Sequence, residues 1–340
     1  MVTRLAGGQR VRPETLGLAN HDARTPEFTI RYDRSHRRQL IYATDGDNSR
    51  RPQEETMEAA GSLIQGAGVH RLARRDSSGV EREYLVAVPD GPVLGVTVLF
   101  HPFGFTPEAV LYGEPAGELL IRPLDGALEP AAATGQIVVA PRSRGRMLAG
   151  ISLAWQDHLD ATWAVARELS ASHGTDVVAV GGLSMGGQEA LVLAAQHADD
   201  VTSVWAVNPV VDLAHWHDDI RDGRASAALL DADATIRDEV GGAPSERPED
   251  YTRRSPIAYA EELARTVVRL VWSGADTIIP GQASYHAHAL AEQLRARDGR
   301  IDERIVTHAP SSPADEPGRF AHEACDVWEH LAWAARTAPA

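Results

Sequence analysis

Ser184 is the residue whose sequence setting most clearly indicates chemistry. It lies in GLSMG (residues 182–186), after an apolar run typical of a buried strand (177–180) and before an apolar helical pattern (about 187–197). A serine on such a strand-to-helix turn carries its hydroxyl clear of the sheet, and a glycine two residues to either side avoids a clash. The pattern predicts a nucleophile; a glycine-rich turn that merely contains a serine is the alternative.

A nucleophilic serine needs a base to accept its proton and an acid to orient that base. Asp276 follows a predicted strand (267–274) in the loop GADTIIP; a capping or turn role is its alternative, and Asp212, after the preceding strand, is the second candidate acid. His322, in GRFAHEA after the last predicted strand, keeps the chain order Ser, Asp, His. His308, at the end of that strand, is the competing base.

Two backbone N–H groups are expected to stabilise a developing oxyanion. Met185 N–H lies at the start of the helix after the serine, where the helix dipole and the unpaired donors favour negative charge. The second donor is expected from the loop HPFGF, which follows the apolar run VTVLF. Pro102 has no N–H, so Phe103 or Gly104 must donate. Together these residues predict attack of the serine on an ester, thioester or amide carbonyl.

From Val69 onward, short apolar strands alternate with longer amphipathic helices. The predicted strands are 69–74, 82–89, 96–101, 137–141, 177–180, 201–209, 267–274 and 301–309. The predicted helices are 153–170, 188–197, 255–265, 284–297 and 321–335. This alternation predicts an α/β fold with a mostly parallel, twisted sheet and helices on both of its faces. Binding and chemistry then belong at the carboxyl ends of the strands.

Two segments interrupt this pattern. Residues about 212–256 are helical and charged, and we expect them to form a lid above the sheet. Residues 1–80 are expected to form an N-terminal extension, with a hairpin of two strands (27–33 and 39–45); this extension is a cap or an oligomerisation segment. Residues 81–340 then form one domain that contains the lid.

Two histidine pairs suggest a metal site at first sight. His215 and His217 are two residues apart, as are His286 and His288. Histidines at this spacing do not face one another on a helix. We therefore expect no metal at either pair.

Composition excludes several classes of function. The formal net charge of −15 argues against binding to nucleic acid or to an acidic membrane. All 33 basic residues are arginine, so Schiff-base, phosphate-loop and serine–lysine chemistry are excluded. Cys325 is the single cysteine and is expected to be a buried apolar residue. With neither the core of a signal peptide nor an apolar run of about 18 residues, the sequence predicts a cytoplasmic protein.

The motifs together resemble those of the α/β-hydrolase superfamily over roughly residues 80–340. GGLSMGG is similar to its nucleophile elbow, GADTIIP to its acid loop, and the loop at His101 to its HGxxG oxyanion segment, with Pro102 in place of the usual glycine. SPIAYAEEL and VVRLVWSGADTIIPGQASYHAHAL are similar to the catalytic domain of the prolyl oligopeptidase family and to related esterases. The resemblance implies an α/β-hydrolase fold and a serine hydrolase.

The leading expectation for function is a serine esterase that acts on a small-molecule acyl substrate without a cofactor. The first alternative is an aminopeptidase or amidase, which would need acidic residues near the entrance to bind a free amine. The second alternative is an acyltransferase or cyclase that uses the same serine, or a binding protein with this fold. Phe103, Phe105, Tyr112 and Trp216 are candidates for an apolar pocket and equally for ordinary core. A homodimer stays an open alternative.

Overall fold

The computed structural model describes residues 64, 66–113, 126–148, 150–226, 229, 232–306 and 329–337, and the backbone alone of residues 8–9, 27–33, 38–44, 55–58 and 327–328. Contacts divide the chain into two units, Met1–Gln53 and Glu54–Ala340.

The first unit contains a small antiparallel sheet. Its strands are β1 (Gly8–Gln9), β2 (Glu27–Asp33) and β3 (Arg38–Thr44), in the order β1-β2-β3. In the pair β2 and β3, Asp33 lies opposite Arg38. The two strands of the expected hairpin therefore pair antiparallel.

The second unit is built on a sheet whose nine described strands follow the order β12-β11-β10-β9-β7-β8-β6-β5-β4. The strands are β4 (Glu55–Glu58), β5 (Gly68–Arg75), β6 (Glu81–Val88), β7 (Gly95–Phe100), β8 (Gln136–Pro141), β9 (Val178–Leu183), β10 (Ser203–Val207), β11 (Val267–Trp272) and β12 (Arg300–Ile305). From β12 to β8 every pair is parallel, which confirms the predicted mostly parallel sheet. β6 runs antiparallel to β8 and to β5.

The boundary between the two units differs from the one expected near residue 80. β5 pairs with β6, and β4 pairs with β5, so both strands belong to the large sheet. The membership of β4 and β5 in this sheet depends on their pairing with neighbouring strands, because neither strand carries a sequence motif that would assign it. The second unit thus begins at Glu54.

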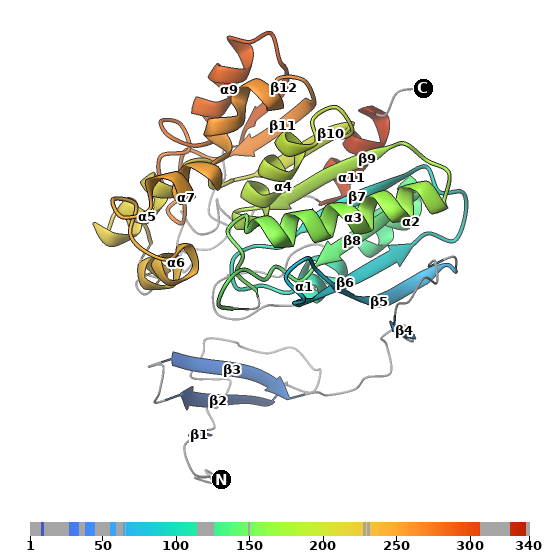
Figure 1. Cartoon of the computed structure of the whole chain (residues 1–340), viewed down its shortest axis with the longest axis horizontal. Coiled ribbons are helices and arrows are strands. Elements are labelled where there is room, and N and C mark those ends of the chain that lie inside the picture. Colours follow the sequence, from blue (N-terminus) through green and yellow to red (C-terminus); the bar gives the residue numbers. More distant parts are fainter. Residues whose placement is uncertain are drawn as a thin grey trace. The chain divides into compact units, whose positions relative to one another are not determined.

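Helices cover both faces of the sheet (Figure 1). On one face α3 (Gln156–Ser172), α4 (Met185–Gln196), α8 (Ala260–Leu263) and α9 (Ala287–Arg295) pack on one alternating set of strand residues, such as Val98 and Leu270. On the other face α1 (Pro107–Tyr112), α2 (Leu128–Thr134) and α11 (Val327–Thr337) pack on the other set, such as Leu99 and Trp205. This period-two division is the arrangement that buried parallel strands require.

Two predicted helices begin later than their apolar pattern suggests. α3 begins at Gln156 rather than at residue 153, because Leu153 and Ala154 have positive φ angles of 49° and 58°. α9 begins at Ala287 rather than at residue 284, because His286, directly before it, has non-helical φ and ψ angles of −114° and −116°. In both cases backbone conformations incompatible with a right-handed helix set the boundary.

α11 is fixed to the sheet by aromatic and ionic contacts. His330 stacks on Trp205 of β10, with ring centroids 5.0 Å apart. The buried Arg269 of β11 lies over the Trp333 ring at 4.4 Å and forms ion pairs with Asp302 (2.6 Å) and Glu329 (3.5 Å). Trp205 lies so close to β9 that a Cβ atom on Gly181 would be 1.9 Å from its ring. These contacts hold α11 against the same strands that lead to the predicted site.

The segment between β10 and β11 contains α5 (Leu213–Arg221), α6 (Ala232–Val240), α7 (Pro248–Arg253) and the 3-10 helix η4 (Pro256–Tyr259). Its apolar side chains form a third cluster together with residues of the loops after β8, β9 and β11, including Leu153, Met185 and Ile279. The helices of this segment therefore pack at the carboxyl ends of the strands. Its role as a lid stays a prediction.

Among the described residues, no helix combines the length and the apolar character needed to cross a bilayer.

Candidate active site

Ser184 occupies the turn between β9 and α4, as predicted. Its φ and ψ angles are 57° and −121°, a conformation that residues other than glycine rarely adopt. A Cβ atom on Gly182 would lie 2.4 Å from the carbonyl carbon of Gly186, and one on Gly186 would lie 2.4 Å from the carbonyl oxygen of Phe100. The two glycines therefore allow the close approach of chain segments that the strained serine turn needs.

The backbone hydrogen bonds around this turn show which N–H groups are already used within the protein. Neither Met185 N–H nor Phe103 N–H donates to another described residue. Gly104 N–H, by contrast, donates to the carbonyl oxygen of Gly150 at 3.0 Å. Of the two candidate donors in the HPFGF loop, Phe103 is therefore the one whose N–H is not used by another described residue.

His101 holds the start of this loop as a neutral ring. Ser143 N–H donates to His101 Nε2 at 2.9 Å, so the proton lies on Nδ1, which donates to the Pro102 carbonyl oxygen at 2.8 Å. Burial lowers the pKa of His101 to about 4. His101 thus orients the peptide group before Phe103 and carries no charge at neutral pH.

Asp276 lies in the loop after β11 and is buried. Its Oδ1 accepts hydrogen bonds from the N–H groups of Ile278 (2.8 Å) and Ile279 (3.1 Å). These two bonds fix the orientation of the carboxylate. Because β9 and β11 both run parallel to β10, Asp276 and Ser184 lie at the same edge of the sheet.

The predicted bases lie outside the described residues. His322 and the competing His308 both belong to the segment between β12 and α11, as does Cys325. The assembly of Ser184, Asp276 and His322 into a triad therefore stays a prediction.

The second candidate acid has a structural role. Asp212 caps α5: its Oδ1 accepts a hydrogen bond from His215 N–H at 3.0 Å. Its own N–H donates to Nδ1 of the buried His286 at 3.2 Å. Both candidate acids thus accept backbone hydrogen bonds, and Asp276, which is 4% exposed against 31% for the Asp212 side chain, stays the predicted acid.

A buried carboxyl that was not among the predicted site residues lies on α4, five residues after Ser184. Glu189 of α4 is 0% exposed and accepts hydrogen bonds from the hydroxyls of Ser143 (2.8 Å) and Ser152. Burial raises its pKa to about 7, against the hydrogen bonds, which lower it. The signal in the sequence is a lone acid in the otherwise apolar helix GGQEALVLAA, but its partners, 37 and 46 residues away, cannot be identified from the sequence.

A second buried carboxyl joins the helical insertion to the loop after β8. Glu239 of α6 accepts hydrogen bonds from Arg146 N–H and from Met147 N–H (2.8 Å). Burial raises the pKa of Glu239. The same loop is thus held by Glu189 from α4 and by Glu239 from α6.

Of the four aromatic pocket candidates, two are core residues. Phe105 and Trp216 are buried, and Trp216 Nε1 donates to the Ile278 carbonyl oxygen at 2.9 Å. Phe103 is half-buried, and its ring meets that of Trp216 edge to face, with centroids 6.2 Å apart. Tyr112 is also half-buried and packs against the core cluster of α1 and α2.

In each of the two histidine pairs, the two side chains contact different residues. His215 stacks on Tyr285 at 3.8 Å, whereas the buried His217 meets Tyr251 edge to face. His286 accepts backbone hydrogen bonds, and His288 binds Glu303 at 2.8 Å. Each histidine therefore has its own structural contacts.

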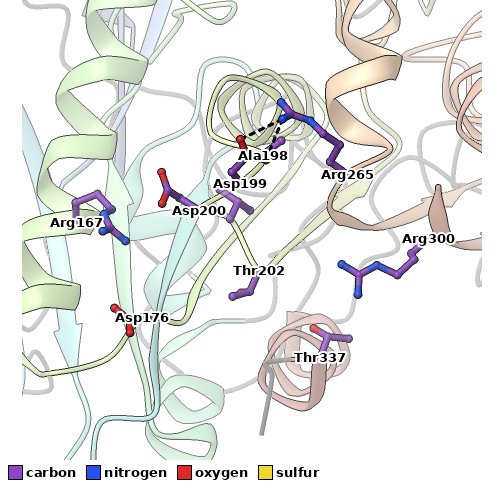
Figure 2. Close-up of a pocket in the computed structure, with 10 residues that line it drawn as sticks. Arg167, Asp176, Ala198, Asp199, Asp200, Thr202, Arg265, Arg300 and Thr337 are labelled. Atoms are coloured by element: carbon purple, nitrogen blue, oxygen red, sulfur yellow. Dashed lines mark hydrogen bonds and ion pairs between the residues drawn. The ribbon is translucent and has the colours of Figure 1, made fainter. Parts of the chain in front are cut away.

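A cavity of about 600 Å³ lies at the opposite edge of the sheet, where the strands begin. Its lining includes Arg167, residues that precede β9, β10 and β11 (Asp176, Asp199 and Arg265), and Arg300 at the start of β12. Figure 2 shows Arg265 bound to Asp199, with N–O distances of 2.9 and 3.1 Å. The cavity lies at the ends where the strands begin, whereas the candidate active site lies at their carboxyl ends, so the two are separate.

Comparison with family models gives one match. The model described as the prolyl oligopeptidase family matches residues 127–309, which is more than half of the 340 residues. The matched range includes Ser184 and Asp276 and ends before His322. No curated protein sequence matches the chain.

Solved structures with the same fold include peptidases and esterases. An acylaminoacyl peptidase from Pyrococcus horikoshii matches with a TM-score of 0.52 and 16% identity, over 74% of this chain and 39% of that one. An S-formylglutathione hydrolase from Agrobacterium tumefaciens matches with a TM-score of 0.51 and 17% identity, over 81% and 98%. A bacterial brefeldin A esterase, a homologue of human hormone sensitive lipase, matches with a TM-score of 0.52 and 18% identity, over 82% and 81%.

These matches confirm the predicted α/β-hydrolase fold. The chain spans less than half the length of the peptidase chain. It spans most of the length of the two other hydrolases.

Proposed function

Because the chain belongs to the prolyl oligopeptidase family of serine hydrolases, we propose that it cleaves an ester, or a related acyl bond, of a small molecule through an acyl-enzyme on Ser184. The observation that carries this proposal is the setting of Ser184 on a positive-φ turn, with the N–H groups of Met185 and Phe103 unused by other described residues. Donors placed in this way stabilise the charge that develops on a tetrahedral intermediate.

In the proposed mechanism, His322 accepts the proton of the Ser184 hydroxyl as the serine oxygen attacks the carbonyl carbon. Asp276 orients the imidazolium that forms. The N–H groups of Met185 and Phe103 donate to the carbonyl oxygen as it becomes an oxyanion. Collapse of the intermediate breaks the ester C–O bond, and the leaving oxygen takes the proton from His322. Water then attacks the acyl-enzyme by the same steps, releases the acid and restores the serine.

Among the described residues, the two buried glutamates that hold the loop after β8 offer no site for the free amino terminus of a peptide, which supports an ester. Recognition of a free amine needs an unpaired acid near the entrance. Glu239 instead accepts backbone hydrogen bonds from Arg146 and Met147, and Glu189 is fully buried. To bind an ammonium group, Glu239 would have to lose its present backbone partners, and Glu189 would first have to become accessible to solvent.

The side chains next to Phe103 support an apolar acyl or alcohol group on the substrate. Phe103 and Leu148 are half-buried and pack against the apolar cluster that includes Met185. Met147, beside Leu148 in the loop after β8, is 58% exposed. An apolar group would be favoured here because its binding removes this apolar surface from water.

The proposal is tested with matched substrates. The p-nitrophenyl ester and the p-nitroanilide of one short, uncharged acyl group are supplied to the native protein and to Ser184→Ala. We expect the native protein to cleave the ester, to release free acid without an added acceptor, and to leave the anilide intact. Ester cleavage that persists in Ser184→Ala contradicts the mechanism. Equal kcat/KM for ester and anilide favours an amidase, and product formation that requires an acceptor favours an acyltransferase.

A further inference from the structure

Glu189 is a buried acid whose carboxylate accepts hydrogen bonds from a distant part of the chain. The hydroxyls of Ser143 and Ser152 both donate to this carboxyl group, which lies on α4 five residues after Ser184. Among the described ion pairs, none includes Glu189. A buried acid held in this way is costly to lose, because its donors would be left unsatisfied.

One of these donors, Ser143, holds the oxyanion loop on both sides of Phe103. Its N–H donates to Nε2 of His101 at 2.9 Å. Its carbonyl oxygen accepts from Gly150 N–H at 2.5 Å, and the carbonyl oxygen of Gly150 accepts from Gly104 N–H at 3.0 Å. The residues two before and one after Phe103 are therefore both tied to the Ser143 backbone.

The other hydroxyl donor, Ser152, belongs to a different part of the network. It precedes Leu153 and Ala154, whose φ angles are positive. The carbonyl oxygens of Ser152 and Leu153 accept hydrogen bonds from Arg254 Nη1 at 3.1 and 3.2 Å. This turn is strained, and Ser152 itself makes no hydrogen bond to the oxyanion loop among the described residues; the bond from Gly104 goes to Gly150, two residues before it.

We infer that Glu189 is a positioning residue that acts through Ser143, holding the Phe103 N–H in register with the Met185 N–H on its own helix. Both donors must point to the same oxygen, yet they lie on different segments of the chain. The Glu189–Ser143 hydrogen bond joins those segments. This inference rests on the proposed function, because it concerns the oxyanion of that reaction.

Ser143 and Ser152 form a matched pair for the test. Both are fully buried and both donate to Glu189, but of the two only Ser143 itself hydrogen-bonds a residue of the loop that contains Phe103, through its N–H to His101. Ser143→Ala and Ser152→Ala are compared for kcat and KM on the activated ester and for urea unfolding. We expect kcat to fall about tenfold in Ser143→Ala with KM unchanged within about twofold, because a misplaced donor acts mainly in the transition state. In Ser152→Ala we expect kcat to stay within about twofold, at a similar loss of stability.

Glu189→Gln provides a second, nearly isosteric variant. It should lower kcat, and the double variant with Ser143→Ala should lower it no further than Ser143→Ala alone, because both changes break the same connection. Equal effects of the two serine variants on kcat, or additive effects of Glu189→Gln and Ser143→Ala, would overturn the inference and leave the proposed function standing. A native protein that neither cleaves esters nor labels at Ser184 overturns both.

Discussion

At the scale of single residues, close backbone contacts shape the serine turn. A Cβ atom on Gly186 would meet the carbonyl oxygens of Phe100 (2.4 Å) and His101 (2.7 Å). These are backbone atoms, so no side-chain rotation can relieve the clash. The packing of α4 on β7, and with it the position of Ser184, therefore depends on glycine at this point.

Gly186→Ala tests this contact. We expect the variant to lose at least about 100-fold in ester kcat/KM, because the turn must shift, and about 3 kcal/mol or more in the free energy of unfolding. Urea unfolding and ester kinetics measure the two effects. Gly91→Ala is the control, since a Cβ atom there has no neighbour within 4 Å, and it should change stability by less than about 0.5 kcal/mol. Native-like activity in Gly186→Ala would show that the turn does not need this approach.

Single-residue roles could be predicted where a local motif carries them. The glycines around Ser184 follow from the spacing of the motif, whereas the choice of Asp276 over Asp212 depends on strand ends and stays a prediction. The role of Glu189 could not be predicted, because its two serine partners lie on a distant loop. Likewise, the choice of Phe103 over Gly104 depends on a contact between Gly104 and Gly150 that only the fold creates.

At the scale of elements, α11 is joined to the sheet mainly through Arg269. The guanidinium is 1% exposed and is surrounded by Trp333, Asp302 and Glu329. Burial lowers its pKa, whereas the hydrogen bond to Asp302 raises it. Because the segment that contains His322 connects β12 to α11, the anchoring of α11 also bears on the predicted base.

Arg269→Met tests that anchoring. The change leaves Asp302 and Glu329 without their buried partner, and we expect a loss of about 3 kcal/mol in unfolding free energy. We also expect a lower kcat, because the segment before α11 is less well held. Arg265→Met removes only an exposed ion pair with Asp199 and should cost less than about 1 kcal/mol. Equal losses in the two variants would show that α11 does not depend on Arg269.

The existence and type of most elements could be predicted, because buried strands and amphipathic helices have distinct apolar periods. Their order in the sheet could not, since it depends on pairing between segments far apart in the chain. The assignment of β4 and β5 to the large sheet is the clearest case. The later start of α3 likewise depends on the positive φ angles of Leu153 and Ala154, which no propensity predicts.

At the scale of the whole molecule, four of the buried histidines in the described part of the chain have strongly lowered pKa values. Burial lowers the pKa of His101 to about 4, and those of His158, His286 and His330 to about 3. Their unfolded pKa lies near 6.5. The stability that these groups contribute is therefore fully present above about pH 6.5 and is lost as the pH falls toward 4 and 3. Glu189 acts in the opposite direction, because its pKa is raised to about 7.

We predict a steep loss of stability between pH 6.5 and 4.5, to which each histidine contributes about 1.4 kcal/mol per pH unit. His158→Phe removes one of these groups. Neither of its ring nitrogens has a hydrogen-bond partner among the described residues, and its ring meets Phe100 edge to face. Urea unfolding at several pH values should show a slope that is shallower by about 1.4 kcal/mol per pH unit in this variant. An unchanged slope would show that His158 does not carry this dependence.

Labelling with a fluorophosphonate probe measures whether Ser184 is an activated nucleophile. The native protein and Ser184→Ala are treated at neutral pH, and the modified residue is identified by mass spectrometry. We predict one phosphonyl group per chain, attached to Ser184, and no labelling of the variant. Labelling at another residue, or a folded native protein that neither labels nor cleaves activated esters, would contradict the account.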